Sequence, residues 1–339
     1  MISEMKRKLF NDPSGIVSIL EDYNFCHIKV NEKEIRFARD YDGGPNIVIR
    51  LTNNDALMVV DYPRALRCDL IAYLIKTKGC TFKEVISKMR IVTGITDTYK
   101  PVQTREIFGG IYKNIHKRTT PHIETYPDSL LNQYLPYGNQ MFLDDGISLE
   151  TQRKFNICFN GQENCVIIPI YDPMGNLMGC KARVNQKDAG RGKYYYDVPC
   201  LMSQTLYGFS VNYEHLCEND IFVFESEKSV MLSYTYGYKN CVALGSDSVS
   251  DTQAKLLSSL CPKRIILMLD YGLDLGITKR NLDLIQRVCA GRNLDLWYWD
   301  WEYNEWMSDK DSPVDRGKDC FRRVVTSELV KYEVRLEDR

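Results

Sequence analysis

Paired cysteines, long apolar runs and an excess of one charge are all missing from this chain of 339 residues. Its twelve cysteines stand singly, with no Cys-x-x-Cys pair, and its four histidines keep no ligand spacing to them. That pattern argues against a disulfide scaffold and against a zinc site. No apolar stretch approaches the roughly 18 residues of a membrane helix, and no signal peptide is recognisable. We expect reduced thiols, no membrane partner and a cytoplasmic location.

A net positive charge is also lacking, because 44 lysines and arginines face 45 aspartates and glutamates. Binding to nucleic acid would therefore need a local basic patch. No Gly-x-x-x-x-Gly-Lys-Ser/Thr phosphate loop occurs. Apolar residues make up 44% of the chain, which is enough for sizeable cores, and the length favours two or three domains.

The first 95 residues predict a small α/β unit. A start signal, Asp12-Pro13-Ser14, precedes one helix, and Thr81 and Glu84 form a capping box that opens another. Segment 96–127 loses this periodicity and is typical of a basic linker, which is either simply solvated or follows a nucleic-acid backbone. The remaining expected elements are a helix at 69–77 and strands at 27–30, 34–37, 47–51 and 56–60.

From about residue 128 a larger α/β domain is expected. A helix at 148–155 comes first and a hairpin at 166–170 and 177–184 follows, and strands then alternate with helices. This alternation favours a parallel sheet covered by helices. The expected strands are 221–224, 241–244, 264–269 and 294–299, and the expected helices are 226–236, 251–260 and 277–289.

Acidic residues follow each of these four strands. They are Glu225 after the first, Asp247 after the second, Asp270 and Asp274 after the third, and Asp311 and Asp315 in the loop after the fourth. In an open α/β sheet, sites form at the carboxyl ends of the strands. Carboxylates that converge there repel one another unless a cation neutralises them, and such hard ligands favour Mg²⁺ or Mn²⁺. The simpler alternative is that the acids only cap helices.

These acids resemble the pattern of a Toprim domain, which carries a Glu after its first strand and an Asp-x-Asp after a later one. Glu225, in Phe-Glu-Ser-Glu-Lys-Ser, matches the first element, and Asp270 matches the first Asp of the second. The ordered set of stretches from 145 to 285 resembles the DnaG-type primases of bacteria and phages. It comprises Asp145-Gly146-Ile147-Ser148-Leu149-Glu150, Ile168-Pro169-Ile170, Arg183-Val184, Lys193-Tyr194, Thr205-Leu206-Tyr207-Gly208 and Thr252-Gln253-Ala254-Lys255.

The N-terminal unit resembles the zinc-binding domain of these primases without its ligands. The stretch from Ala65 to Leu74 and the helix from Thr81 fit the family. Where the family has its two ligand pairs, this chain has Phe37-Ala38-Arg39-Asp40 and Asp61-Tyr62-Pro63-Arg64. The resemblance therefore implies a zinc-ribbon-like domain held by apolar packing alone, with no zinc. So small a domain has little apolar core with which to replace the stabilisation that a metal gives.

The chain also departs from the family near the site. Asp270-Tyr271-Gly272-Leu273-Asp274 is not Asp-x-Asp, because the second Asp is displaced by two positions. Ser229 stands for the family's Asp after its catalytic Glu, and Cys165 and Met202 stand for two of its basic residues. The compact, divergent form is closest to a primase encoded by a phage or mobile element.

The resemblance implies the fold class and domain order. We expect an α/β protein with a Toprim-type parallel sheet flanked by helices and an N-terminal zinc-ribbon-like small α/β domain lacking zinc ligands. The expected divisions are a template-binding domain (1–95), the linker (96–127), the N-terminal part of a primase RNA-polymerase core (128–220), the Toprim catalytic domain (221–320) and a tail (321–339).

The implied function is a DNA primase that joins ribonucleoside triphosphates into short RNA primers on single-stranded DNA, with a replicative helicase as a further partner. Glu225 would act near the metal, and Asp270 and Asp274 would hold Mg²⁺ or Mn²⁺, with Asp311 or Asp315 contributing. The expected basic contacts to template or nucleotide are Lys181, Arg183, Arg191, Lys193 and Lys228, together with Arg36, Arg39, Arg64 and Arg67 in the N-terminal unit.

Two alternatives remain open. The carboxylates alone do not separate strand joining from strand cutting, so a Mg²⁺-dependent Toprim nuclease stays possible. With the altered Asp-x-Asp and the lost zinc ligands, a degenerate primase that only binds single-stranded DNA or a replisome partner is the other alternative.

Overall fold

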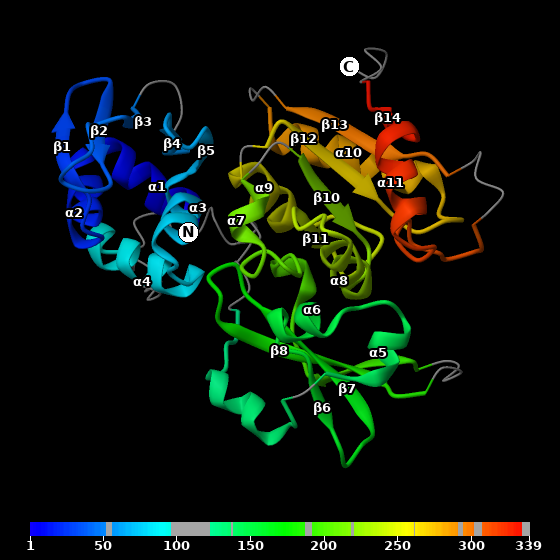
Figure 1. Ribbon diagram of the computed structural model, residues 1–339. Helices are drawn as coiled ribbons and strands as arrows, with labels where there is room; N and C mark the ends of the chain where they lie inside the picture. Colours follow the sequence, from blue (N-terminus) through cyan, green and yellow to red (C-terminus); the bar gives the residue numbers. More distant parts are fainter. Residues whose placement is uncertain are drawn as a thin grey trace, which may run out of the picture.

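The computed structural model describes residues 1–51, 56–95, 123–136, 138–186, 192–217, 220–260, 262–290, 294–301 and 307–333. Each of three units is built on one sheet: the N-terminal sheet, the middle sheet and the C-terminal sheet. In Figure 1 the N-terminal unit lies at the left, the C-terminal sheet at the upper right and the middle sheet below. Residues 96–122 of the expected basic linker (96–127) lie outside the described residues.

The N-terminal sheet is antiparallel, in the order β1-β2-β3-β4-β5. Side chains on its inner face, including Ile35, Phe37 and Val59, are fully buried. The expected start signal is confirmed, since Asp12 caps α2, and so is the Thr81–Glu84 capping box of α4. The elements are α1 (Ile2–Asn11), α2 (Pro13–Asp22), β1 (Cys26–Val30), β2 (Glu34–Ala38), β3 (Ile47–Arg50), β4 (Met58–Asp61), β5 (Leu66–Asp69), α3 (Leu70–Lys78) and α4 (Phe82–Thr93).

The middle sheet is an antiparallel meander in the order β6-β7-β8-β9. The β7–β8 pair is the hairpin expected from the sequence, whereas β6 and β9 were not predicted. The elements of this unit are η2 (Asp128–Gln133), α5 (Gln140–Asp144), α6 (Leu149–Lys154), β6 (Cys158–Asn160), β7 (Cys165–Tyr171), β8 (Leu177–Val184), β9 (Tyr194–Val198), η3 (Met202–Gln204) and α7 (Tyr213–Leu216).

The C-terminal sheet has the order β11-β10-β12-β13-β14, and all its pairs are parallel except β13–β14. The alternation of strands and helices in the sequence predicted this parallel core correctly, but not the antiparallel β14. The elements are β10 (Asp220–Phe224), α8 (Glu227–Tyr236), β11 (Cys241–Ala243), α9 (Asp251–Ser259), β12 (Arg264–Met268), α10 (Leu275–Val288), β13 (Asp295–Trp299), α11 (Lys318–Ser327) and β14 (Leu329–Lys331).

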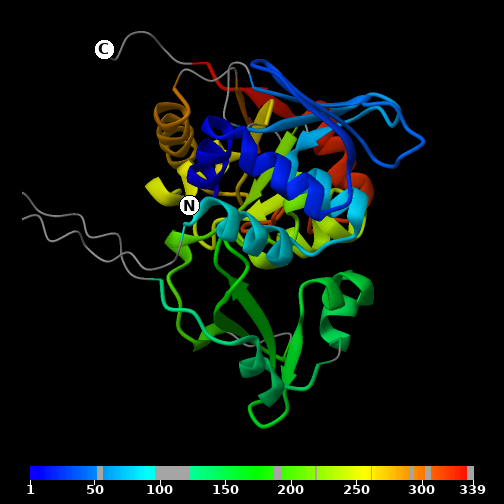
Figure 2. The same cartoon turned by 90° about the vertical axis from the view of Figure 1, so that its left-hand side faces the viewer.

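Both faces of the C-terminal sheet are covered. Along β10, Ile221 and Val223 join one apolar cluster, and Phe222 and Phe224 join another, as the two-residue period of a strand dictates. The first cluster includes α9, α10 and the helices of the N-terminal unit, and the second includes α8, α11 and one face of the middle sheet. In the turned view of Figure 2, the N-terminal unit lies in front of the C-terminal sheet, with the middle sheet below.

A buried polar contact joins the N-terminal unit to α7. Asp69 is 1% exposed and accepts hydrogen bonds from Lys6 Nζ, from Ala72 N at the start of α3, and from Tyr213 Oη at 2.9 Å. The Phe82 ring lies 4.7 Å from the Tyr213 ring. The N-terminal core is therefore continuous with that of the C-terminal sheet, and this shared core helps to stabilise so small a unit.

The described cysteines are free thiols. Within the described ranges, no helix combines the length and the apolar character that crossing a membrane demands.

Removal of the Tyr213 hydroxyl should destabilise the protein. Tyr213→Phe leaves buried Asp69 with one donor fewer, and we expect a loss of about 1–3 kcal/mol in the free energy of unfolding. Tyr207→Phe is the matched control, since the buried Tyr207 hydroxyl has no partner among the described residues. Thermal or urea unfolding measures both variants. If the two are equally stable, the Asp69 contact does not join the units.

Candidate active site at the carboxyl edge of the C-terminal sheet

Glu225 and Asp270 follow neighbouring strands in the interior of the C-terminal sheet. β10 and β12 run parallel, with Phe224 opposite Met268. Glu225 is the first residue after β10, and Asp270 is the second after β12. Because parallel strands end at the same edge, the structure brings these two carboxylates together, at the place where open α/β sheets form their sites.

The two carboxylates are half-buried, and one oxygen of each is fully buried. Burial, and then the charge of Glu225, raise the pKa of the Asp270 carboxyl to about 8, with Asp315 and Asp311 adding to the rise. Burial also raises the pKa of Glu225, with Asp247 adding and Lys181 opposing. Glu225 Oε2 and Asp270 Oδ1 accept no hydrogen bond from any described residue. This arrangement demands a proton or a cation between the two side chains.

The donor atoms fit a divalent metal such as Mg²⁺ or Mn²⁺. Such cations take oxygen ligands and keep several waters, so two carboxylates can suffice, with substrate phosphates completing the shell. In the described part of the chain, no three acidic, histidine or cysteine side chains are gathered closely enough to hold a metal by themselves. The fit therefore rests on the two unpaired oxygens of Glu225 and Asp270.

The acid-rich loop 308–315 packs against the end of β12. Tyr271 N donates to Asp311 O at 2.8 Å, and Lys310 N donates back to Tyr271 O at 3.0 Å. Gly272 permits the approach, because it has a φ of +84° and a Cβ there would lie 2.4 Å from Asp309 Oδ1. These contacts bring the charges of the loop to Asp270.

The two acids predicted from this loop are already engaged. Asp311 accepts from Ser308 N at 2.8 Å and from Arg316 Nε at 2.7 Å. Asp315 accepts from Ser312 N at 2.8 Å. The structure places both close enough to raise the pKa of Asp270.

Asp274 lies differently from the other acids. It is exposed and caps α10, accepting from Gly276 N at 2.8 Å. It does not appear among the charges that raise the pKa of Asp270. The structure therefore places Asp311 and Asp315 electrostatically nearer to Asp270 than it does the displaced second Asp of the motif.

Two charged residues at this edge were not singled out from the sequence. Glu227 is 1% exposed, and both of its oxygens accept from Lys181 Nζ, at 3.0 and 2.9 Å. Lys310 has a φ of +65° and opposes the rise in the pKa of Glu225. A second glutamate two residues after Glu225 could have indicated Glu227 from the sequence, whereas no sequence pattern indicates Lys310.

Predicted basic residues form a cluster beside the acids. Lys181 Nζ, Arg183 Cζ and Lys193 Nζ lie 5.2, 5.4 and 6.0 Å from the centre of the Tyr194 ring. Burial lowers the pKa of Lys193, and the charges of Arg183 and Lys228 add to this.

Lys228 links this cluster to the acid edge. Its Nζ lies 3.4 Å from Asp145 and 3.5 Å from Asp315. The structure thus brings together Lys181, Arg183, Lys193 and Lys228, whereas Arg191 lies outside the described residues.

Basic residues also line the outer face of the N-terminal sheet. Arg36 pairs across the strands with Val48, Val48 with Val60, and Val60 with Arg67. Opposed residues share one face of a sheet, so Arg36 and Arg67 flank two valines on the face turned away from the core. Arg36 Nε also bonds Glu34 at 2.6 Å.

An ion pair stands where the family's zinc ligands would be. Arg39 Nη2 donates to Asp61 Oδ1 at 3.2 Å, and Asp61 is fully buried. Asp61 also accepts from Tyr73 Oη at 3.1 Å and from Arg64 N at 3.2 Å. This network joins the turns after β2 and β4. It leaves Arg64 exposed, whereas the charge of Arg39 is partly neutralised.

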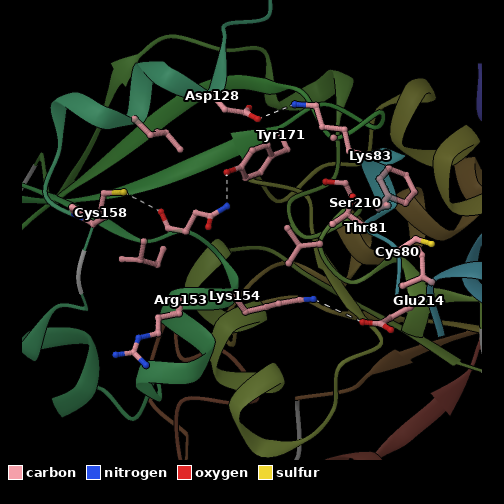
Figure 3. Close-up of a pocket in the computed structure, with 18 of the residues that line it drawn as sticks. Cys80, Thr81, Lys83, Asp128, Arg153, Lys154, Cys158, Tyr171, Ser210 and Glu214 are labelled. Carbon is pink, nitrogen blue, oxygen red and sulfur yellow. Dashed lines mark hydrogen bonds and ion pairs between the residues drawn. The ribbon is translucent and has the colours of Figure 1, made fainter. Parts of the chain in front are cut away.

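A cavity of about 930 Å³ lies where the N-terminal and middle units meet. Figure 3 shows Lys83 paired with Asp128 on one side and Lys154 with Glu214 on another, with N···O distances of 2.8 and 3.8 Å. Arg153 lines it as well, but none of the carboxylates at the sheet edge does. The cavity is therefore separate from the candidate active site.

Asp270→Asn should stabilise the protein at alkaline pH. An unfolded Asp270 titrates near 3.8, whereas the folded carboxyl keeps its proton to about pH 8. The free energy of unfolding of the parent therefore falls as the pH rises from 3.8 to about 8, because only the unfolded state releases the proton. The substitution removes this fall, since asparagine does not titrate. Without divalent cations we expect little gain at pH 4 and a gain of several kcal/mol at pH 8, because each unit of pKa shift corresponds to about 1.4 kcal/mol.

Urea unfolding across this pH range measures the effect. Asp319→Asn is the control, because that carboxylate is 89% exposed on α11. If the free energies of unfolding of Asp270→Asn and the parent differ by the same amount at every pH, the pKa of Asp270 is not raised in the folded protein.

Comparisons with known proteins show similarity to DnaG primases at the level of fold. No family model matches the chain. The SPbeta prophage-derived uncharacterized protein YorJ of Bacillus subtilis (strain 168) is 26% identical over 243 residues, and the match spans 63% of this chain and 63% of that relative's length. The zinc-binding and RNA polymerase domains of the Aquifex aeolicus primase match 98% of this chain and 86% of their own, with 16% identity and a TM-score of 0.46. The DnaG primase catalytic domain bound to ssDNA matches 60% of this chain and 77% of its own, with 18% identity and a TM-score of 0.47.

Proposed function

We propose that this chain is a DNA primase that joins ribonucleotides into short RNA primers on a single-stranded DNA template. The observation that carries the proposal is the half-buried pair Glu225 and Asp270, each with one buried and unpaired oxygen, beside a cluster of lysines and arginine. Carboxylates next to cations are the combination that metal-dependent phosphoryl transfer uses.

Each part of the site has a role in this proposal. Glu225 and Asp270 hold a Mg²⁺ or Mn²⁺ ion, with Asp274, Asp311 or Asp315 contributing. When bound, the ion neutralises charge that develops on the transferred phosphoryl group.

The basic cluster holds the triphosphate. The charges of Arg183 and Lys228 help to lower the pKa of Lys193, so a bound polyphosphate would relieve the repulsion among these three cations.

The outer face of the N-terminal sheet is the proposed template surface. Arg36 and Arg67 are exposed there, and Arg64 is exposed on the turn between β4 and β5. Such a surface binds a phosphate backbone through charge without reading sequence. Zinc plays no part in this proposal, and a replicative helicase remains a predicted partner.

The deciding experiment is primer synthesis by the purified protein. With a mixed-sequence single-stranded template, labelled ribonucleoside triphosphates and Mg²⁺ or Mn²⁺, we expect short RNA products. Glu225→Gln and Asp270→Asn should lower the rate by about 100-fold or more, since each removes a charge that the transition state needs. Asp319→Asn serves as the control.

The other outcomes separate the alternatives. A template that is bound but not copied would favour a degenerate primase, and a shortened template would favour a nuclease.

Asp274→Asn tests whether the displaced acid of the motif binds the ion. Asparagine caps a helix as well as aspartate does, so the melting temperature should not change. If Asp274 contributes to the metal site, we expect primer synthesis to fall by about tenfold at low Mg²⁺ and to recover at high Mg²⁺. Unchanged synthesis at every Mg²⁺ concentration would leave Asp274 as a helix cap only.

A further inference from the structure

The edge strand β9 carries three consecutive tyrosines, of which Tyr194 and Tyr196 share one face. β8 and β9 pair so that Lys181 stands opposite Tyr196 and Arg183 opposite Tyr194. Opposed residues and residues two apart lie on the same face of a sheet. Two cations and two aromatic rings therefore alternate on one face of the middle sheet.

This face is turned toward the C-terminal sheet. On β7, the residues opposite Lys181 and Arg183 are Ile168 and Val166, which pack in the cluster shared with Phe222 and Phe224 of β10. Lys181 itself reaches Glu227 at the start of α8. Tyr196 thus stands at the rim of the space beside the acid edge, on the strand that ends the middle sheet.

The two rings differ in what covers them. Lys181, Arg183 and Lys193 all lie over Tyr194. Although Lys181 is paired across the strands with Tyr196, its ammonium group contacts Tyr194 and Glu227 instead. Tyr196 is 41% exposed, and no described ring or cation lies over it.

Tyr195 is also exposed, but it lies on the other face of the strand. Its hydroxyl donates to Glu163 at 2.6 Å and contacts Cys165 Sγ. An exposed ring beside positive charge is the arrangement that binds nucleobases, because a base stacks on the ring while cations attract its phosphates.

We propose that Tyr196 is a stacking subsite for a nucleobase, beside the cations that hold phosphate. The inference rests on the proposed function, since it names what the same site would recognise. The base belongs either to an incoming nucleoside triphosphate or to the template strand, and both offer the same aromatic face.

The test uses 2-aminopurine, whose fluorescence falls when the base stacks. One probe is 2-aminopurine riboside triphosphate, and the other is a single-stranded DNA oligonucleotide carrying one 2-aminopurine. The full chain with Asp270→Asn prevents turnover during the titration. In this background we compare Tyr196→Ala, Tyr196→Phe and Tyr195→Ala, and melting temperatures confirm that each variant is folded.

We expect Tyr196→Ala to remove the quenching of one probe and to weaken its binding about fivefold or more. Tyr196→Phe keeps the ring and should behave as the parent does, and Tyr195→Ala should bind normally. Inorganic tripolyphosphate, which has no base, should bind Tyr196→Ala and the parent equally. The probe that loses its quenching identifies the source of the base.

Two results would overturn the inference. One is equal quenching of both probes by Tyr196→Ala and the parent, and the other is an equal loss in Tyr195→Ala. Failure of the function itself is distinguishable: a protein that makes no primers but quenches a probe only with an aromatic residue at 196 keeps the subsite and loses the primase assignment.

Discussion

The parallel register of β10 and β12 is the constraint on which the candidate site depends, because it brings Glu225 and Asp270 to one edge of the sheet. Both carboxylates are half-buried there, and each keeps a buried oxygen without a partner among the described residues. The neighbouring acids have cationic partners, since Lys181 pairs with Glu227 and Lys228 lies against Asp315. The charges of Lys181 and Lys310 only partly offset the rise in the pKa of Glu225, and none is recorded as opposing the rise at Asp270. Carboxyl groups with raised pKa values at a sheet edge are typical of functional sites.

A second buried group fixes the N-terminal unit to this site. Asp69 collects donors from α1, from the start of α3 and from α7, which precedes β10 in the chain. The apolar cluster around it runs without interruption into the C-terminal sheet. The outer face with Arg36 and Arg67 therefore belongs to a unit packed firmly on the sheet that carries the acids, and the Arg39–Asp61 pair holds its turns.

Local signals predicted much of this structure, and contacts between distant residues did not follow from them. Buried runs such as 221–224, the β7–β8 hairpin and the Thr81 capping box all depend on near neighbours and could be recognised. Helix α1 lacks a side-chain cap, and the run of tyrosines in β9 breaks the alternation expected of a strand, so both were missed. The convergence of Glu225 and Asp270 could be inferred because parallel strands share an edge. The hydrogen bond from Tyr213 to Asp69 joins residues 144 positions apart, and no local sequence pattern predicts it.

The distribution of positive charge bears on the choice between joining and cutting. Carboxylates that hold a cation serve both reactions. A nuclease needs to grip one strand at the site of cleavage, whereas a polymerase must hold a nucleotide and a template at the same time. The described residues form two separate basic surfaces, one around Tyr194 beside the acids and one on the outer face of the N-terminal sheet. The Asp69 contact stabilises their relative position. Two basic surfaces in a fixed relative position can bind the nucleotide and the template, which are the two substrates of strand joining. This favours the primase over the nuclease.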